Sequence, residues 1–87
     1  MPPRPTPTTG DVLLAYELPA AADVFLSVFD IAGRERARLV SGRVPAGRHE
    51  VRWNGRSAEG KPLPDGVYFA RLTALETSRS ERVLLMR

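Results

Sequence analysis

The sequence predicts an all-β fold, an antiparallel β-sandwich of six or seven strands. Short runs in which apolar and polar residues alternate with period two are typical of half-buried strands. Turn signals rich in Gly, Pro, Asn and Asp separate these runs at spacings of roughly 8–12 residues. The helix-like stretch 35–40 lies between Gly33 and Gly42 and is too short for a stable helix, so no helix is expected.

The expected strands follow one another closely along the chain. They cover residues 12–18, 24–29, 34–41, 48–53, 67–75 and 80–86, with a short seventh strand near 61–63. Asp30 and Gly33 mark a type I turn, and residues 76–79 are expected to connect the last two strands. Residues 1–9 are rich in Pro and Thr and favour a linker or edge segment. Residues 10–87 then form a single β-sandwich domain.

Two aromatic residues are predicted to be structural core anchors. Trp53 shares a strand face with Val51, and Tyr68 follows Asp65 by three residues at the start of a long strand. This is the position of the tyrosine corner in immunoglobulin-like sandwiches, so an immunoglobulin/fibronectin-III-like fold is expected. Strand phase predicts a core made of Val12, Leu14, Leu18, Val24, Leu26, Val28, Leu39, Val51, Trp53, Tyr68, Ala70, Leu72, Val83 and Leu85.

Length and composition exclude several classes of protein. A chain of 87 residues forms one domain with a thin core, so an enclosed substrate cavity and enzymatic activity are not expected. The absence of Cys excludes disulfides, thiolate zinc sites and thiol nucleophiles. No window approaches the roughly 20 apolar residues of a membrane span, so none is expected.

Three motifs resemble catalytic or ligand sites only in part. Residues 55–61 match most of a phosphate-binding loop, but Pro62 stands where Ser or Thr would bind magnesium. His49 is the single His, and we expect it at the rim of the core, not as a catalytic base. A weak structural calcium site near Asn54 and Glu59 remains an alternative, although the Asp and Asn residues lack calcium-loop spacing. We therefore expect no catalytic residue, no cofactor and no metal.

Arg34, Arg36 and Arg38 alternate along one expected strand. Alternation would place the three guanidinium groups on one side of the strand, where they would bind an anionic glycan or another polyanion. The preferred alternative is a solvated edge strand whose charges discourage edge-to-edge aggregation. Nucleic-acid binding is not expected, because no aromatic residues interleave with the basic ones.

Four segments together resemble one bacterial module. They are 16–19 (YELP), 24–33 (VFLSVFDIAG), 45–55 (PAGRHEVRWNG) and 65–69 (DGVYF). Their order and spacing resemble the C-terminal sorting domain (type A) of proteins exported by the type IX secretion system. They are also similar to the immunoglobulin-like domain of the flagellar hook-capping protein. The resemblance covers residues 9–87, nearly the whole chain.

The resemblance implies a non-catalytic C-terminal accessory module of a larger secreted bacterial protein. Its expected role is export sorting, cell-surface attachment or docking, and its expected place is outside the cell or on its surface. Secretion or cell-surface machinery, or neighbouring domains of the parent protein, would be the partners. One alternative is a carbohydrate-binding module with an exposed aromatic platform, which burial of Trp53 and Tyr68 would exclude. The other is a self-assembling structural cap like the hook-capping domain.

Overall fold

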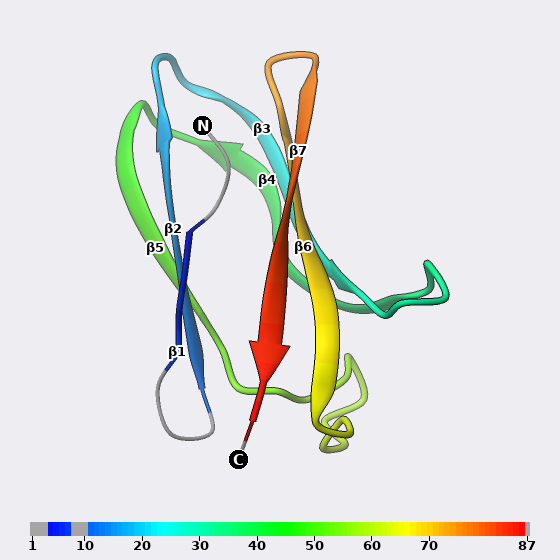
Figure 1. The fold of residues 1–87 in the computed structure, drawn as a ribbon. Coiled ribbons are helices and arrows are strands. Elements are labelled where there is room, and N and C mark those ends of the chain that lie inside the picture. Colours follow the sequence, from blue (N-terminus) through cyan, green and yellow to red (C-terminus); the bar gives the residue numbers. More distant parts are fainter. Residues whose placement is uncertain (1–3, 8–10, 87) are drawn as a thin grey trace.

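Seven strands form two facing antiparallel sheets in the computed structural model, which describes residues 4–7 and 11–86 (Figure 1). The strands are β1 (Arg4–Pro7), β2 (Val12–Leu18), β3 (Ala22–Phe29), β4 (Glu35–Val44), β5 (Gly47–Trp53), β6 (Gly66–Ala74) and β7 (Thr77–Leu85). The smaller sheet has the order β1-β2-β5, and the larger has the order β4-β3-β6-β7. The described residues contain no helix. The predicted all-β sandwich is confirmed.

The chain passes between the two sheets after β2, β4 and β5. Only Pro45 and Ala46 connect β4 to β5. Because Pro45 has no N–H group to continue the ladder, β4 ends at the residue before it. The longer loop 54–65 links β5 to β6 across one end of the sandwich (Figure 1). These passages set Trp53, at the end of β5, close to Tyr68, near the start of β6.

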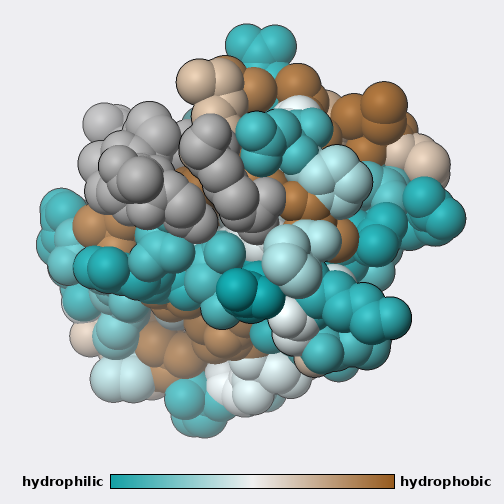
Figure 2. All heavy atoms as spheres, turned by 90° about the horizontal axis from the view of Figure 1, so that it is seen from below, coloured by the Kyte–Doolittle hydropathy of each residue, from teal (hydrophilic) through white to brown (hydrophobic). Residues whose placement is uncertain are grey.

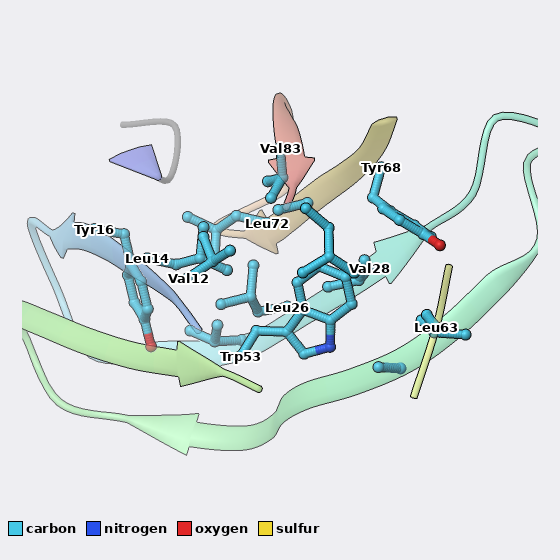
Figure 3. Close-up of a cluster of buried hydrophobic side chains, with 14 of the residues drawn as sticks. Val12, Leu14, Tyr16, Leu26, Val28, Trp53, Leu63, Tyr68, Leu72 and Val83 are labelled. Carbon is cyan, nitrogen blue, oxygen red and sulfur yellow. The ribbon is translucent and has the colours of Figure 1, made fainter. Parts of the chain in front are cut away.

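Inward-facing side chains of both sheets meet in one core (Figure 3). Its buried members are Val12, Leu14, Tyr16, Leu18, Val24, Leu26, Val28, Ala37, Trp53, Leu63, Tyr68, Ala70, Leu72, Val83 and Leu85. Every residue expected in the core belongs to this set except Leu39 and Val51, which are partly buried against it. Tyr16, Ala37 and Leu63 join the core without having been predicted, and Leu63 comes from the loop between β5 and β6.

The connection between β6 and β7 is shorter than the sequence predicts. Ala74 pairs with Thr77, so Leu75 and Glu76 alone form the turn, and the expected connection over 76–79 is wrong. Both turn residues have positive φ, 52° and 60°, as a two-residue type I′ turn requires. The usual sequence signal for this turn is Asn-Gly or Asp-Gly, which this hairpin lacks.

The seventh strand also lies elsewhere than expected. Residues 61–63 form no strand, and only an isolated bridge joins Arg56 to Pro62. The seventh strand is β1, which pairs antiparallel with β2 at the edge of the smaller sheet. Residues 1–3 and 8–9 of the expected linker or edge segment lie outside the described residues, as does Gly10 of the expected domain. The division into residues 1–9 and 10–87 therefore stays a prediction.

Candidate functional site

The turn between β3 and β4 is built around the carboxylate of Asp30. Its Oδ1 accepts hydrogen bonds from the backbone N–H groups of Ala32 (2.9 Å) and Arg34 (3.0 Å). Its Oδ2 pairs with Arg34 Nε (3.1 Å) and Arg36 Nη1 (3.3 Å). The bond from the Arg34 N–H, followed by a smaller contribution from Arg36, holds the pKa of Asp30 below its ordinary value. The ionised carboxylate therefore shapes the turn and offsets one of the two positive charges beside it.

A second ion-paired group forms on the outer face of the same hairpin. Arg38 donates from Nε to Glu35 Oε1 (3.2 Å) and from Nη2 to Oε2 (3.1 Å), which is a bidentate pair. The hydroxyl of Ser27 on β3 donates to the same Oε1 (2.6 Å). The bonds from Arg38 and then Ser27 lower the pKa of Glu35, and the pair raises the pKa of Arg38.

The three arginines expected in one row are thus divided between two carboxylates. Arg34 and Arg36 face Asp30, whereas Arg38 faces Glu35. The ladder between β3 and β4 is irregular at two points along this segment, so simple alternation along β4 does not hold. Each guanidinium already has an acidic partner, which reduces the charge available to a polyanion. Binding of a polyanion by these residues stays a prediction.

Trp53 and Tyr68 meet inside the core, where their rings pack edge to face with centroids 5.4 Å apart (Figure 3). Trp53 is 1% exposed and Tyr68 is 6% exposed. The indole Nε1 donates to the carbonyl oxygen of Arg56 (3.1 Å), and the Tyr68 hydroxyl donates to that of Pro64 (2.6 Å). Both polar atoms are therefore bonded to the loop between β5 and β6. Buried in this way, the two rings offer no platform for a sugar.

The loop between β5 and β6 is closed by its own hydrogen bonds. The Ser57 N–H donates to the Lys61 carbonyl oxygen (2.8 Å), and the Lys61 N–H donates to Ser57 Oγ (3.3 Å). A phosphate-binding loop would instead lead into a helix, and the described residues contain none. His49 lies at the rim, with Nε2 2.8 Å from the Pro45 carbonyl oxygen. Within residues 4–7 and 11–86, no cluster of three or more acidic or His side chains is placed to hold a metal ion.

The outward side of β6 and β7 carries an exposed mixture of apolar and Arg side chains that the sequence analysis did not identify. We call it the outer β6–β7 face and define it by Val67, Phe69, Arg71, Arg82, Leu84 and Met86. Val67 pairs with Leu84 across the ladder, and Phe69 pairs with Arg82. Figure 2, which shows one end of the molecule, likewise has hydrophobic areas reaching the surface among hydrophilic ones. In the sequence, these residues alternate with the core positions of β6 and β7, and this alternation is the signal by which they could have been predicted to face outward.

Comparison with known proteins identifies the family. The family model described as the FlgD Ig-like domain matches residues 5–78. The chain belongs to the FlgD Ig-like domain family. Among solved structures, the crystal structure of FlgD from P. aeruginosa is similar, with a TM-score of 0.65 and 22% sequence identity. The similarity covers 95% of this chain and 65% of that one, so the chain spans less than two thirds of that FlgD structure. A search of curated proteins found no match.

Of the two modules that the sequence resembles, membership in the FlgD Ig-like domain family supports the second. The match is to the hook-capping protein, and the type IX sorting domain is not shown by it. The expectation of a non-enzymatic module stays a prediction. The expected extracellular setting stays a prediction. The described residues include no helix able to cross a membrane.

Proposed function

We propose that this chain is a non-catalytic docking module of an extracellular bacterial assembly, of the kind represented by the flagellar hook cap. The family match over residues 5–78 is the observation that supports this proposal, because it spans the sandwich from β1 into β7. Burial of Trp53 and Tyr68 adds support, since it removes the aromatic platform that the carbohydrate-binding alternative required.

Docking through side chains of a sheet face suits this sandwich better than strand addition at the β4 edge. The register of β4 is irregular at two points, and such bulges interrupt a pairing edge. The N–H of Ala58 also donates to the carbonyl oxygen of Arg36 (2.9 Å), so the loop between β5 and β6 occupies part of this edge. At the β4 side of the larger sheet, a partner would therefore contact exposed side chains and not the strand edge.

Export sorting or surface attachment is the second candidate, and it rests on the sequence resemblance. The two candidates differ in what happens to the chain. A sorting module directs an attached protein through the envelope, whereas a cap stays within the assembly that it closes. The assembly reading is the one that the family match supports.

The test follows an epitope-tagged chain, kept in its natural gene context, in the bacterium that produces it. Surface appendages and envelope fractions are sheared off, separated by mass and probed for the tag. We expect the chain in a high-mass extracellular fraction, and expect Trp53→Ala, which disrupts the core, to be lost from it. Retention in the cytoplasm, or release as a free monomer, would contradict the proposal. A reporter protein that is exported only when this chain is fused to it would support sorting instead.

A further inference from the structure

The outer β6–β7 face has the composition of a protein interface. Interface cores are enriched in aromatic residues, Met and Arg and depleted in Lys, Glu and Asp. Phe69, Arg71, Arg82 and Met86 represent the enriched types. Leu84, which is 54% exposed, lies opposite the exposed Val67, so the apolar side chains of this face form a patch. The other outward positions of β6 and β7 within the described residues are Thr and Ser, so none of them is acidic.

The two guanidinium groups of this face have no acidic partner. Every ion pair within the described residues involves other cations, so neither Arg71 nor Arg82 is paired with a carboxylate. Arg71 lies over the ring of Phe29, 4.6 Å from its centroid, which positions its guanidinium against the sheet. Arg71 pairs with Ser80 and Arg82 pairs with Phe69 across the ladder. The two arginines are therefore diagonal neighbours on one surface.

A groove extends this face toward the turn between β3 and β4. It has a volume of about 440 Å³ and lies between that turn and the start of β6. Ile31 at the tip of the turn, which is 78% exposed, and Val67 both line it. Because Val67 also belongs to the outer β6–β7 face, the groove and the face are continuous. An apolar side chain of a partner would fit into the groove beside these two residues.

We propose that the outer β6–β7 face binds an acidic segment of another protein. The carboxylates of this segment pair with Arg71 and Arg82. Its apolar side chains pack on the exposed apolar side chains of the face, which are Val67, Phe69, Leu84 and Met86. This inference rests on the proposed docking function and names the surface and the partner chemistry. Charge complementarity selects the partner, because Arg71 and Arg82 make the face cationic and no carboxylate lies on it. The adjoining groove is lined by both signs of charge, Asp30 and Asp65 together with Arg34 and Arg36, so the selection by charge rests on Arg71 and Arg82. A second copy seated face to face would bring like charges together. The aliphatic Val67 and Leu84 favour a polypeptide over a sugar chain.

The test uses the whole chain, immobilised, and a random twelve-residue peptide library displayed on phage. Peptides enriched over those captured by an unrelated sandwich domain are synthesised, and their affinity is measured by fluorescence anisotropy. We expect enriched peptides to combine Asp or Glu with aromatic or aliphatic residues, and to bind more weakly as salt is raised. Amide chemical shifts of the labelled chain then locate the bound peptide, which we expect on β6 and β7.

Matched variants separate this face from general electrostatic attraction. Arg71→Gln with Arg82→Gln should weaken peptide binding by about tenfold, as expected when charged contacts at an interface are removed. Arg48→Gln with Arg52→Gln makes the same change in net charge on the smaller sheet, where both side chains are exposed, and should change affinity less than twofold. Leu84→Ser tests the apolar part of the contact without loss of charge.

Two outcomes would overturn the inference in different ways. If acidic peptides bind the Arg71/Arg82 variant as tightly as the parent, another surface docks them, and the proposed docking function stands without this face. If no peptide is enriched and the chain instead binds polygalacturonate with loss in the same variant, the face binds an acidic glycan. Protein docking by this chain would then lose its support. Melting temperatures of all variants show whether each is folded.

Discussion

The hydroxyl of Tyr68 donates a 2.6 Å hydrogen bond to the carbonyl oxygen of Pro64, four residues earlier in the chain. This bond ties the start of β6 to the loop that leads into it, as the tyrosine corner does in immunoglobulin-like sandwiches. The same ring packs against Trp53, whose indole is bonded to the other end of the loop at Arg56. One pair of aromatic side chains thus joins the core to the loop between the sheets.

Removal of this hydroxyl should lower stability measurably. Tyr68→Phe keeps the ring but loses the bond to Pro64, and a typical net hydrogen bond contributes about 1 kcal/mol. For a domain of this size, that corresponds to a fall in melting temperature of roughly 4–8 °C. Tyr16→Phe is the matched control, because the Tyr16 hydroxyl makes no hydrogen bond to the described residues. Equal shifts in the two variants, measured by circular dichroism, would show that the corner adds nothing.

Truncation of Trp53 should unfold the domain or nearly so at 37 °C. Replacing a buried Trp by Ala costs about 3–5 kcal/mol, and a domain this small has roughly 5–8 kcal/mol in total. Phe25→Ala is the control, since Phe25 points outward and is 47% exposed. Denaturant unfolding followed by far-ultraviolet circular dichroism measures both. A Trp53→Ala midpoint within experimental error of the parent would mean that Trp53 is peripheral to stability.

Period-two alternation predicted most of the core because most strands are regular. Val24, Leu26 and Val28 alternate without interruption and are all fully buried. The method fails on β4, where Leu26 pairs with Val40 but the next residue, Ser27, pairs with Arg38. This irregularity leaves Leu39 without a partner and reverses the phase of the strand. Leu39 is therefore only partly buried, and a bulge of this kind has no signal in single-strand periodicity.

The surface was less predictable than the core because it depends on register between strands. The contacts of Asp30 with Arg34 and Arg36 span at most six residues, so local turn chemistry makes them foreseeable. The position of Arg82 beside Phe69 could not be predicted from local sequence in the same way. It requires the pairing of β6 with β7, which is set by the turn at Leu75 and Glu76 that the sequence did not reveal.

The turn at Leu75 and Glu76 offers a route to a more stable variant. Both residues have left-handed backbone, which costs roughly 1–2 kcal/mol for residues other than Gly, Asn and Asp. Leu75→Asn with Glu76→Gly supplies the preferred type I′ sequence and should raise the melting temperature by several degrees. Leu75→Ala is the control, because it removes the side chain and keeps the strained backbone. A double variant that melts at or below the parent temperature would argue against strain in this turn.

The loss of folding stability at acidic pH should depend on Asp30. Its pKa in the folded chain is lower than the ordinary 3.8, chiefly because the Arg34 N–H donates to it. A carboxylate whose pKa is lower in the folded chain than in the unfolded chain stabilises the fold fully at pH values above its unfolded-state pKa. This contribution is lost as the pH falls through the folded-state pKa. We expect Asp30→Asn to flatten the loss of stability below pH 3.8. Carbon-detected titration of the Asp30 carboxyl provides the direct check, and a pKa at or above 3.8 would contradict this account.

Heparin retention should reveal how far Asp30 and Glu35 neutralise their arginines. Arg34, Arg36 and Arg38 are all ion-paired, so the parent should elute from heparin at a salt concentration below the physiological one. At physiological salt, exposed charges are already screened beyond about 8 Å. Asp30→Asn with Glu35→Gln frees the guanidinium groups, so this variant should elute later. Replacing the three arginines by Gln should abolish the increase while changing the melting temperature little.

The opposite result would make this hairpin a site. Elution of the parent only above about 0.5 M salt, where long-range attraction is strongly screened, would require direct contacts with the polyanion. Loss of that retention in the triple Gln variant would assign the contacts to Arg34, Arg36 and Arg38. Equal retention in the parent and the triple variant would instead place the contact on other cations. Arg71→Gln with Arg82→Gln tests the outer β6–β7 face directly, because neither arginine there is held by a carboxylate of the described residues.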